Sequence, residues 1–518
     1  MSATTIIRDQ LARREHLRAL ERYILQDQWS QGDGWTGPNP TDLETGTARD
    51  FLTLIEREFV SRNILNEVIT RHRDGVLGRE PRWQFIKESG QARLVKEAEE
   101  ALTSWWDDSG IPSVLQFAVR TLMFASERTA SSDSPQPARS PLRLHVKARS
   151  INADGRIPRR RDLNEALRDI NLHAAAPYAA GILRNLDGDP IATHYTYLDT
   201  DDQHRVEVTG IARDLREAGF QVPSAYPDAF TIVLVTDREL NPLEDAAYDL
   251  GGRQLMHEMT REPLITSSAV SQQKLINKAF TMMSHNLNVA GFTERTFLNA
   301  QMPGHWVDAD GERASADQGG VRFVPDPLYV GAGASNFIAG LPSVGDDGVT
   351  RYTTPSLLYR DPVPPAAFTD TIREAKFAVL EETKQLHVVL TGDGVASGAS
   401  RIQAANDFVG SLEMTAVEVN RAVRWALESA LALASVLMGS PRRYDGLRPV
   451  AEARISAVQA TSEDVEAAIA KLQAGLISRE SAMSEVGVED TDAELVKIAS
   501  EGEGGMPPGE DAPSGRRG

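Results

Sequence analysis

Residues 402–437 read IQAANDFVGSLEMTAVEVNRAVRWALESALALASVL. Apolar side chains recur along this stretch at steps of three and four, the spacing that places them on one face of an α-helix. They are Ile402, Ala405, Val409, Leu412, Ala416, Val419, Val423, Leu427, Ala430, Ala434 and Leu437. The spacing predicts one continuous helix that spans roughly 55 Å at 1.5 Å per residue. Gly439, Ser440 and Pro441 follow it and favour its end there.

The residues just before this helix favour a loop. Gly392, Gly394 and Gly398 fall within seven positions, and glycine at that density opposes a stable helix. A glycine-rich loop at a helix start can bind phosphate, but this one lacks the Gly-Lys-Ser/Thr ending of a nucleotide-binding loop. We therefore expect a flexible connection between two helices.

Two further amphipathic helices flank a segment rich in proline and glycine. The first is predicted from about Ser268 to Phe297, and the second follows the Pro364-Pro365 pair. Residues 303–365 between them contain only short β-like pieces at 321–324 and 349–353, which indicates an inserted module. The apolar positions expected to pack these helices are Leu275, Ala279, Met282, Phe368, Ile372, Ala375 and Val379.

The rest of the chain mixes helices and strands. Before residue 130 the patterns predict four helices. The first ends near Trp29, the second covers about 47–69, the third covers about 91–106, and the fourth runs from about Pro112. Alternating patterns then predict strands at 142–146, 193–197, 206–208 and 230–235, with a helix at 162–173. Residues 462–487 predict two short helices, and 501–518 are expected to be disordered. The fold class is therefore α+β, mainly helical.

The composition excludes several functions. Lys and Arg number 55 against 74 Asp and Glu, a net charge of −19, and there is no cysteine. Thiolate metal sites and cysteine nucleophiles are therefore excluded, and tight binding to DNA phosphates is disfavoured. No apolar run reaches membrane-spanning length, and the first residues carry charges, so we expect a soluble, cytoplasmic protein.

The chain carries no set of residues typical of catalysis. His257-Glu258 has no second histidine four residues on, so it does not match the zinc-protease motif. The acidic run 199–202 has two interpretations, a solvated turn or a cation site, and the missing downstream Glu favours the turn. We therefore expect no catalytic residue, no metal ligand and no cofactor.

Basic and aromatic residues also have two interpretations each. The triplet 159–161 is Arg-Arg-Arg, which suits either a phosphate backbone or a solvated helix entrance. Trp105, Trp106 and Trp425 lie at helical positions suited to packing, and no interleaved basic residues favour base stacking.

The order of these parts resembles the portal proteins of tailed bacteriophages and related viruses. One stretch that carries the resemblance is VASGASRIQ at 395–403, which is similar to the Ser-Gly junction between that family's loop and long helix. The other is AIAKLQAGLISRESA at 468–482, followed by VGVED at 486–490 and by Glu494. This stretch is similar to the family's C-terminal helices.

The resemblance implies a portal-like protomer that assembles into a ring of about twelve copies. Its parts would be a wing at 1–265, a first stem helix at 266–300, a clip at 301–365, a second stem helix at 366–389, a channel loop at 390–400, a long wing helix at 401–440, a helical crown at 441–500 and a disordered tail at 501–518. The loop residues that would face DNA are Thr391, Gly392, Asp393, Gly394, Val395, Ala396, Ser397 and Gly398.

The resemblance also implies a function without enzymatic activity. The ring would be the channel at a capsid vertex through which double-stranded DNA is packaged and ejected. Its partners would be a terminase motor, a head-completion or adaptor protein and the major capsid or scaffolding protein, with no membrane. It would be assembled in the host cytoplasm and reside in the virion. Two alternatives stay open: an unrecognised cytoplasmic enzyme, and a minor structural or scaffold head protein without a channel.

Overall fold

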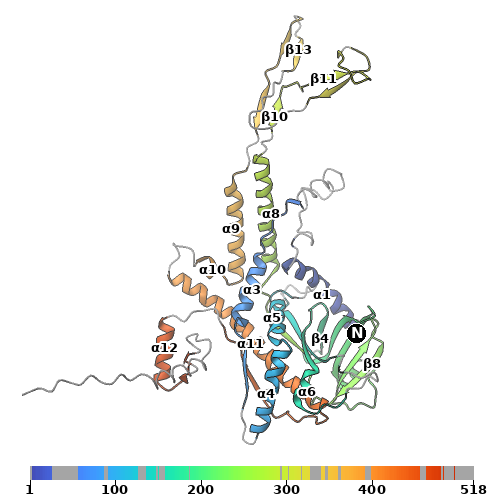
Figure 1. Cartoon of the computed structure of the whole chain (residues 1–518), viewed down its shortest axis with the longest axis vertical. Coiled ribbons are helices and arrows are strands. Elements are labelled where there is room, and N and C mark those ends of the chain that lie inside the picture. The colour runs from blue at the N-terminus through green and yellow to red at the C-terminus, as the bar shows by residue number, and fades with distance from the viewer. Residues whose placement is uncertain are drawn as a thin grey trace, which may run out of the picture. The chain divides into compact units, whose positions relative to one another are not determined.

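A computed structural model of the chain shows a mixed α+β protein with about 45% helix and 23% strand (Figure 1). The described residues are 3–25, 28, 57–86, 91–126, 136–147, 150, 158–185, 187–291, 295–301, 303–316, 318–326, 340–344, 348–359, 363–390, 398–455, 462–479, 482–483 and 495. Two compact units share the chain. The first is drawn from 1–33, 63–273 and 375–518, and the second from 34–62 and 274–374.

The first unit contains most of the helices. They are α1 (Ala3–Leu25), α3 (Ile64–Leu77), α4 (Ala92–Asp108), α5 (Ile111–Leu122), α6 (Leu163–Arg168), α7 (Ala212–Glu217), α10 (His387–Leu390), α11 (Gly398–Leu437) and α12 (Ser462–Gln473). Helices α8 (Ser267–Gly291) and α9 (Pro365–Glu382) contribute residues to both units. The long helix predicted at 402–437 is confirmed as α11.

Helix α11 is the centre of the first unit. From Ala426 to Leu437 almost every side chain is buried, as expected of a helix that is apolar on all sides. It packs against β9 (Met256–Arg261), β16 (Pro449–Glu452), α6 and α10. Helix α3 lies close to it at Gly75. A Cβ atom at that position would lie only 2.7 Å from the Leu412 side chain.

Three antiparallel sheets complete the first unit. One has the order β4-β5-β6-β7-β8, and its inner face packs with α1 and α7 around Val208, Leu215 and Ile232. A three-stranded sheet has the order β3-β2-β9, and β1 pairs with β16. The strands not yet bounded are β1 (Arg82–Phe85), β2 (Ala138–Val146), β3 (Ile170–Ala174), β4 (Ala180–Arg184), β5 (Pro190–Leu198), β6 (His204–Ile211), β7 (Thr231–Thr236) and β8 (Pro242–Tyr248).

The second unit combines helix segments with short β-ribbons. The ribbons follow α8 in the chain and lie beyond its end (Figure 1). Each is a two-stranded antiparallel sheet: β10 with β15, β11 with β12, and β13 with β14. Their bounds are β10 (Arg295–Leu298), β11 (Gly304–Val307), β12 (Arg322–Pro325), β13 (Pro342–Val344), β14 (Thr350–Tyr352) and β15 (Ser356–Tyr359).

Four turns share one design. Each begins with Asp or Asn, whose side chain accepts backbone N–H groups further along the turn, and each has a left-handed fourth residue. The turns are 185–189, 199–203 and 237–241 in the first unit and 308–312 in the second. The acidic run at 199–202 therefore forms the predicted turn, and Arg205 pairs with its Asp199 at 2.7 Å.

Three predicted helices differ from the structure. Residues 59–63, inside the helix predicted at 47–69, are not helical, and α3 begins after Asn63, whose Oδ1 accepts the N–H of Asn66 at 3.0 Å. The helix predicted at 162–173 ends at Arg168, and Ile170–Ala174 pairs with β2. The helix predicted to reach Phe297 ends at Gly291, and Arg295–Leu298 pairs with β15. A partner strand distant in sequence decided the second and third cases.

Most of the second C-terminal helix, predicted after Ser478, and the tail 501–518 lie outside the described residues. Strand β16, which falls in the range 441–500 assigned above to the crown, pairs with β1 in the N-terminal half of the chain.

The turn design predicts a backbone-specific effect at Gly188. Its φ is +90°, and no atom lies within 4 Å of the position that a Cβ would take, so any loss comes from backbone strain alone. Gly188→Ala should lower the free energy of unfolding by about 1–2 kcal/mol, read as a shift in the midpoint of urea unfolding. Asp202→Gly, at the equivalent position with φ of +56°, should not lower it. An unchanged midpoint for Gly188→Ala would contradict the strain argument.

Candidate functional site

The predicted channel loop lies mostly outside the described residues. Residues 391–397 are not described, and Gly398, predicted in the loop, is the first residue of α11. Directly before the loop, α10 packs against α11. There the His387 ring lies 4.5 Å from the ring of Phe408, tilted by 31°. The structure thus describes how the chain enters the loop.

The segment that leads into α10 is held by α3. Gln385 is fully buried, and its Nε2 donates to the backbone oxygen of Val68 at 2.9 Å. Its Oε1 accepts from Arg71 at 3.4 Å. Lys384 before it has a φ of +59° and ends α9, with the N–H of Gln385 bonded to the oxygen of Leu380 at 2.7 Å. The start of the loop is therefore set by contacts far from it in sequence.

The seven residues predicted to pack the stem helices differ in burial. Three are buried, namely Ala279 at 6% exposed, Ala375 at 3% and Val379 at 0%. Met282, Phe368 and Ile372 are half-buried, and Leu275 is 41% exposed. Ala375 and Val379 belong to the first unit, and the others belong to the second.

A buried polar stripe on α8 was missed by the sequence analysis. In the second unit, Asn277 and Thr281 are fully buried, and both bind the backbone of residues 60–62. The N–H of Arg62 donates to Asn277 Oδ1 at 3.3 Å, and the N–H of Val60 donates to Thr281 Oγ1 at 3.1 Å. One turn further on, His285 Nδ1 lies 3.0 Å from a Glu58 carboxylate oxygen.

The spacing of these polar residues along α8 matches the spacing of alternate residues along an extended segment. Four residues rise about 6 Å along a helix, and two residues span about 7 Å along an extended chain. Side chains at every fourth position of α8 can therefore reach every second residue of an extended segment. Gln273, four residues before Asn277, does the same in the first unit, where its Oε1 accepts the N–H of Ile64 at 2.9 Å. Polar residues at steps of four were the signal in the sequence.

The C-terminal part of α8 forms two hydrogen bonds to the residues just before α9. Asn286 Nδ2 donates to the backbone oxygen of Val363 at 2.9 Å, and the N–H of Val363 donates to Asn286 Oδ1 at 2.9 Å. Because α9 begins at Pro365, this pair sets where the second helix starts in the second unit.

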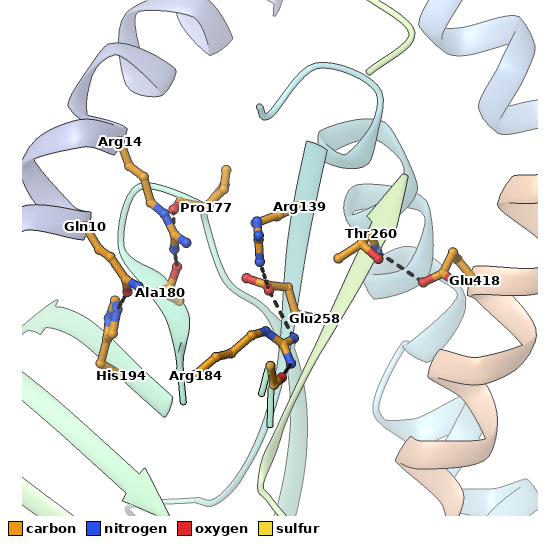
Figure 2. A network of polar contacts seen from close by, with 11 residues as sticks. Gln10, Arg14, Arg139, Pro177, Ala180, Arg184, His194, Glu258, Thr260 and Glu418 are labelled. Atoms are coloured by element: carbon orange, nitrogen blue, oxygen red, sulfur yellow. Dashed lines mark hydrogen bonds and ion pairs between the residues drawn. The ribbon is translucent and has the colours of Figure 1, made fainter. Parts of the chain in front are cut away.

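A second polar network joins the sheets and helices of the first unit (Figure 2). The Glu258 side chain, on β9, is fully buried and accepts from Arg139 of β2 at 2.6 Å. Arg184 of β4 lies 3.7 Å from the same carboxylate. Two residues on, the N–H of Thr260 donates to Glu418 of α11 at 3.1 Å. Strands from two sheets and the long helix therefore meet at β9.

The same figure shows how α1 is fastened to the larger sheet. Arg14 is 3% exposed and donates to the backbone oxygen of Ala180 on β4. Gln10, one turn earlier, accepts at its Oε1 a hydrogen bond from Nε2 of the His194 ring at 3.0 Å. These contacts explain why a helix rich in arginine packs against a sheet.

Residues singled out in the sequence as possible binding groups serve the fold. Arg159 donates to the backbone oxygen of Met438 at 2.7 Å, just after α11, and Arg160 pairs with Asp169. Trp105 and Trp106 are buried, as predicted, with exposures of 3% and 4%. Trp425 donates to the backbone oxygen of Gln254 at 3.2 Å. Among the described residues, no group of three or more His, Cys, Asp or Glu side chains could hold a metal ion.

Comparisons with known proteins leave the function open. No protein family model matches this sequence, and no curated protein matches it. Within the described part of the chain, no helix is long and apolar enough to cross a membrane. What the protein does must therefore be inferred from its own residues.

The stripe on α8 predicts a loss of stability at Thr281. Thr281→Val keeps the shape of the side chain but removes the hydroxyl that binds the N–H and oxygen of Val60. We expect a loss of about 1–2 kcal/mol in the free energy of unfolding, measured by urea unfolding. Thr281→Ser, which keeps the hydroxyl, is the matched control for that contact and should lose less. A larger loss for the serine variant would show that packing of the methyl group dominates.

Four histidines predict sensitivity to acid: His72 and His194 are fully buried, and His145 and His257 are half-buried. Burial, and next the nearby Arg261 or Arg14, lowers the pKa of His72 and of His194 to about 3. Burial also lowers the pKa of His145 to about 3 and of His257 to about 4. The unfolded chain takes up these protons near pH 6.5 and the folded chain does not, so stability is full above pH 6.5 and is lost as the pH falls towards 4.

The test measures the free energy of unfolding, by urea unfolding, at pH values from 7.5 to 4.5. Each buried neutral histidine adds a slope of about 1.4 kcal/mol per pH unit below its unfolded pKa. His194→Gln, which can still donate to Gln10, should reduce the total slope by one such step. An equal slope for the variant and the wild type would contradict the assignment of His194 as a buried neutral group.

Proposed function

We propose that this chain is a portal protein, the subunit of a ring through which double-stranded viral DNA is packaged and ejected. One observation carries the proposal: α8, a ribbon-bearing segment, α9, α10 and the 40-residue α11 follow one another in that order. In this proposal α8 and α9 are the stem, the ribbons form the clip, and 390–400 is the channel loop. Residues 1–265 supply the wing and 441–500 the crown.

The ribbons of the second unit support a role in assembly. Isolated two-stranded sheets are marginally stable in water, so such ribbons benefit from a partner surface. All residues of β13 and β14 are exposed, including Val344 at 70% and Tyr352 at 67%. Exposed apolar side chains that gather on one module are typical of binding surfaces. In a portal, this module would meet neighbouring copies, the terminase motor and the head-completion or adaptor protein.

The charge of the chain supports passage of DNA without retention. Each copy carries a net charge of −19, so twelve copies would carry about −228. An acidic ring repels the phosphate backbone, which disfavours tight binding. Such a channel would let DNA slide, while a separate motor would supply the hydrolysis of ATP. The ring would occupy a capsid vertex of the virion, in contact with the major capsid or scaffolding protein.

Two other functions compete with this proposal. An enzyme would need a site with a nucleophile, a base and an orienting group, or a metal. A minor structural or scaffold head protein would need no channel. Assembly state separates both from a portal.

The proposal predicts the mass and shape of the purified protein. One chain weighs 56.6 kDa, so a ring of twelve would weigh about 680 kDa, measured by light scattering after size-exclusion chromatography. Negative-stain electron microscopy should show a ring with a central hole. A monomer or dimer under all conditions of salt and concentration would overturn the proposal.

A further inference from the structure

A cleft of about 1110 Å³ lies between α4 and the two-stranded sheet of β1 and β16 in the first unit. Helix α4 lines it with Glu99, Thr103, Trp106 and Asp107, which recur at steps of three and four and so share one helix face. Trp83 of β1 also lines it, and its ring lies 6.2 Å from that of Trp106. The cleft therefore offers aromatic surface beside polar groups.

The charge left unpaired in this cleft is mainly negative. Glu80, Asp107 and Glu452 line it, and none of them forms an ion pair with another described residue. Arg79 and Arg82 also line the cleft but have contacts of their own. Arg454 is the opposing charge. Carboxylates near the C-terminus of a helix are unfavourable, so Asp107 gains most from a cation brought by a partner.

Helix α1 presents the complementary surface. Arg18 and Arg22 are exposed and lie four residues apart, on one face of the helix. Neither forms an ion pair within the part of the chain that the structure describes. The Cβ atoms of residues four apart on a helix lie about 6 Å from each other. Their two guanidinium groups can therefore each reach a carboxylate and stack on an indole ring.

We propose that the cleft between α4 and the β1–β16 sheet binds Arg18 and Arg22 from a second copy of this chain. The inference rests on the proposed function, because a ring requires a contact in which one surface of a copy meets a different surface of the next. The cleft and the arginine pair of α1 are such a pair of different surfaces. Their opposite charge fixes which surface meets which.

The test uses charge reversal on each side of the contact. One variant carries Arg18→Glu and Arg22→Glu, and the other carries Glu80→Arg, Asp107→Arg and Glu452→Arg. Each variant alone sets like charges against each other and should remain at the mass of a single chain. An equal mixture should form rings again, because each contact then joins one reversed surface to another or one native surface to another.

Arg93→Glu is the matched control. Arg93 is exposed on α4 but does not line the cleft, so this variant should assemble as the wild type does. A milder pair, Arg18→Gln with Arg22→Gln, removes charge without reversing it and should raise the protein concentration needed for assembly at least 10-fold. Circular dichroism checks that each variant is folded.

The outcomes separate this inference from the proposed function. A wild-type protein that never forms rings overturns the proposed function and this contact with it. Wild-type rings together with rings of the Arg18→Glu, Arg22→Glu variant alone overturn the contact and leave the proposed function intact. Folded variants that fail to assemble when mixed also overturn the contact. Rings that form only from the mixture support it.

Discussion

The C-terminal half of α11 needs apolar surroundings on every side, and the first unit is arranged to supply them. Small side chains such as Ala426, Ala430 and Ala434 let neighbouring elements approach the helix closely. The buried hydroxyl of Ser435 donates to the oxygen of Leu431 at 2.8 Å, so it leaves no unpaired group. Segments from the N-terminal, middle and C-terminal parts of the chain must therefore converge on one helix.

Polar contacts decide where those segments meet. Glu258 of β9 pairs with arginines from two sheets. Glu418 of α11 accepts the backbone N–H of Thr260, two residues after Glu258. Removing one member of a buried ion pair costs about 3–5 kcal/mol, so these contacts select one arrangement among several that would bury similar apolar area. On α8, polar side chains bind the backbone of residues 60–64, which places few demands on the side chains of that segment.

The second unit differs from the first in how exposed its β-ribbons are. Strands β13 and β14 are exposed throughout, and their residues include Val344 and Tyr352. A segment of this kind gains stability from surfaces outside its own chain. The proposed ring would supply them, and the acidity of the chain would keep DNA from binding to the same surfaces. In such a ring, the same contacts would stabilise this module and join the copies.

The sequence determined the features that depend on neighbours a few residues away. The period of three and four in 402–437 predicted α11 because the partners of each turn lie within the same stretch. The mixed fold class followed in the same way from the change to alternation after residue 140. The order of helix, inserted module, helix and long helix, on which the functional proposal stands, is likewise visible in the sequence.

Only the tertiary structure decided features that need a distant partner. Phe297 lies in a strand because Leu357 pairs with it, and no local pattern contains that partner. Asn277 and Thr281 look like ordinary solvent-facing positions until the segment at 58–62 binds them. A buried polar group is stable only when its partner is in place, and that partner lies more than two hundred residues away in the chain.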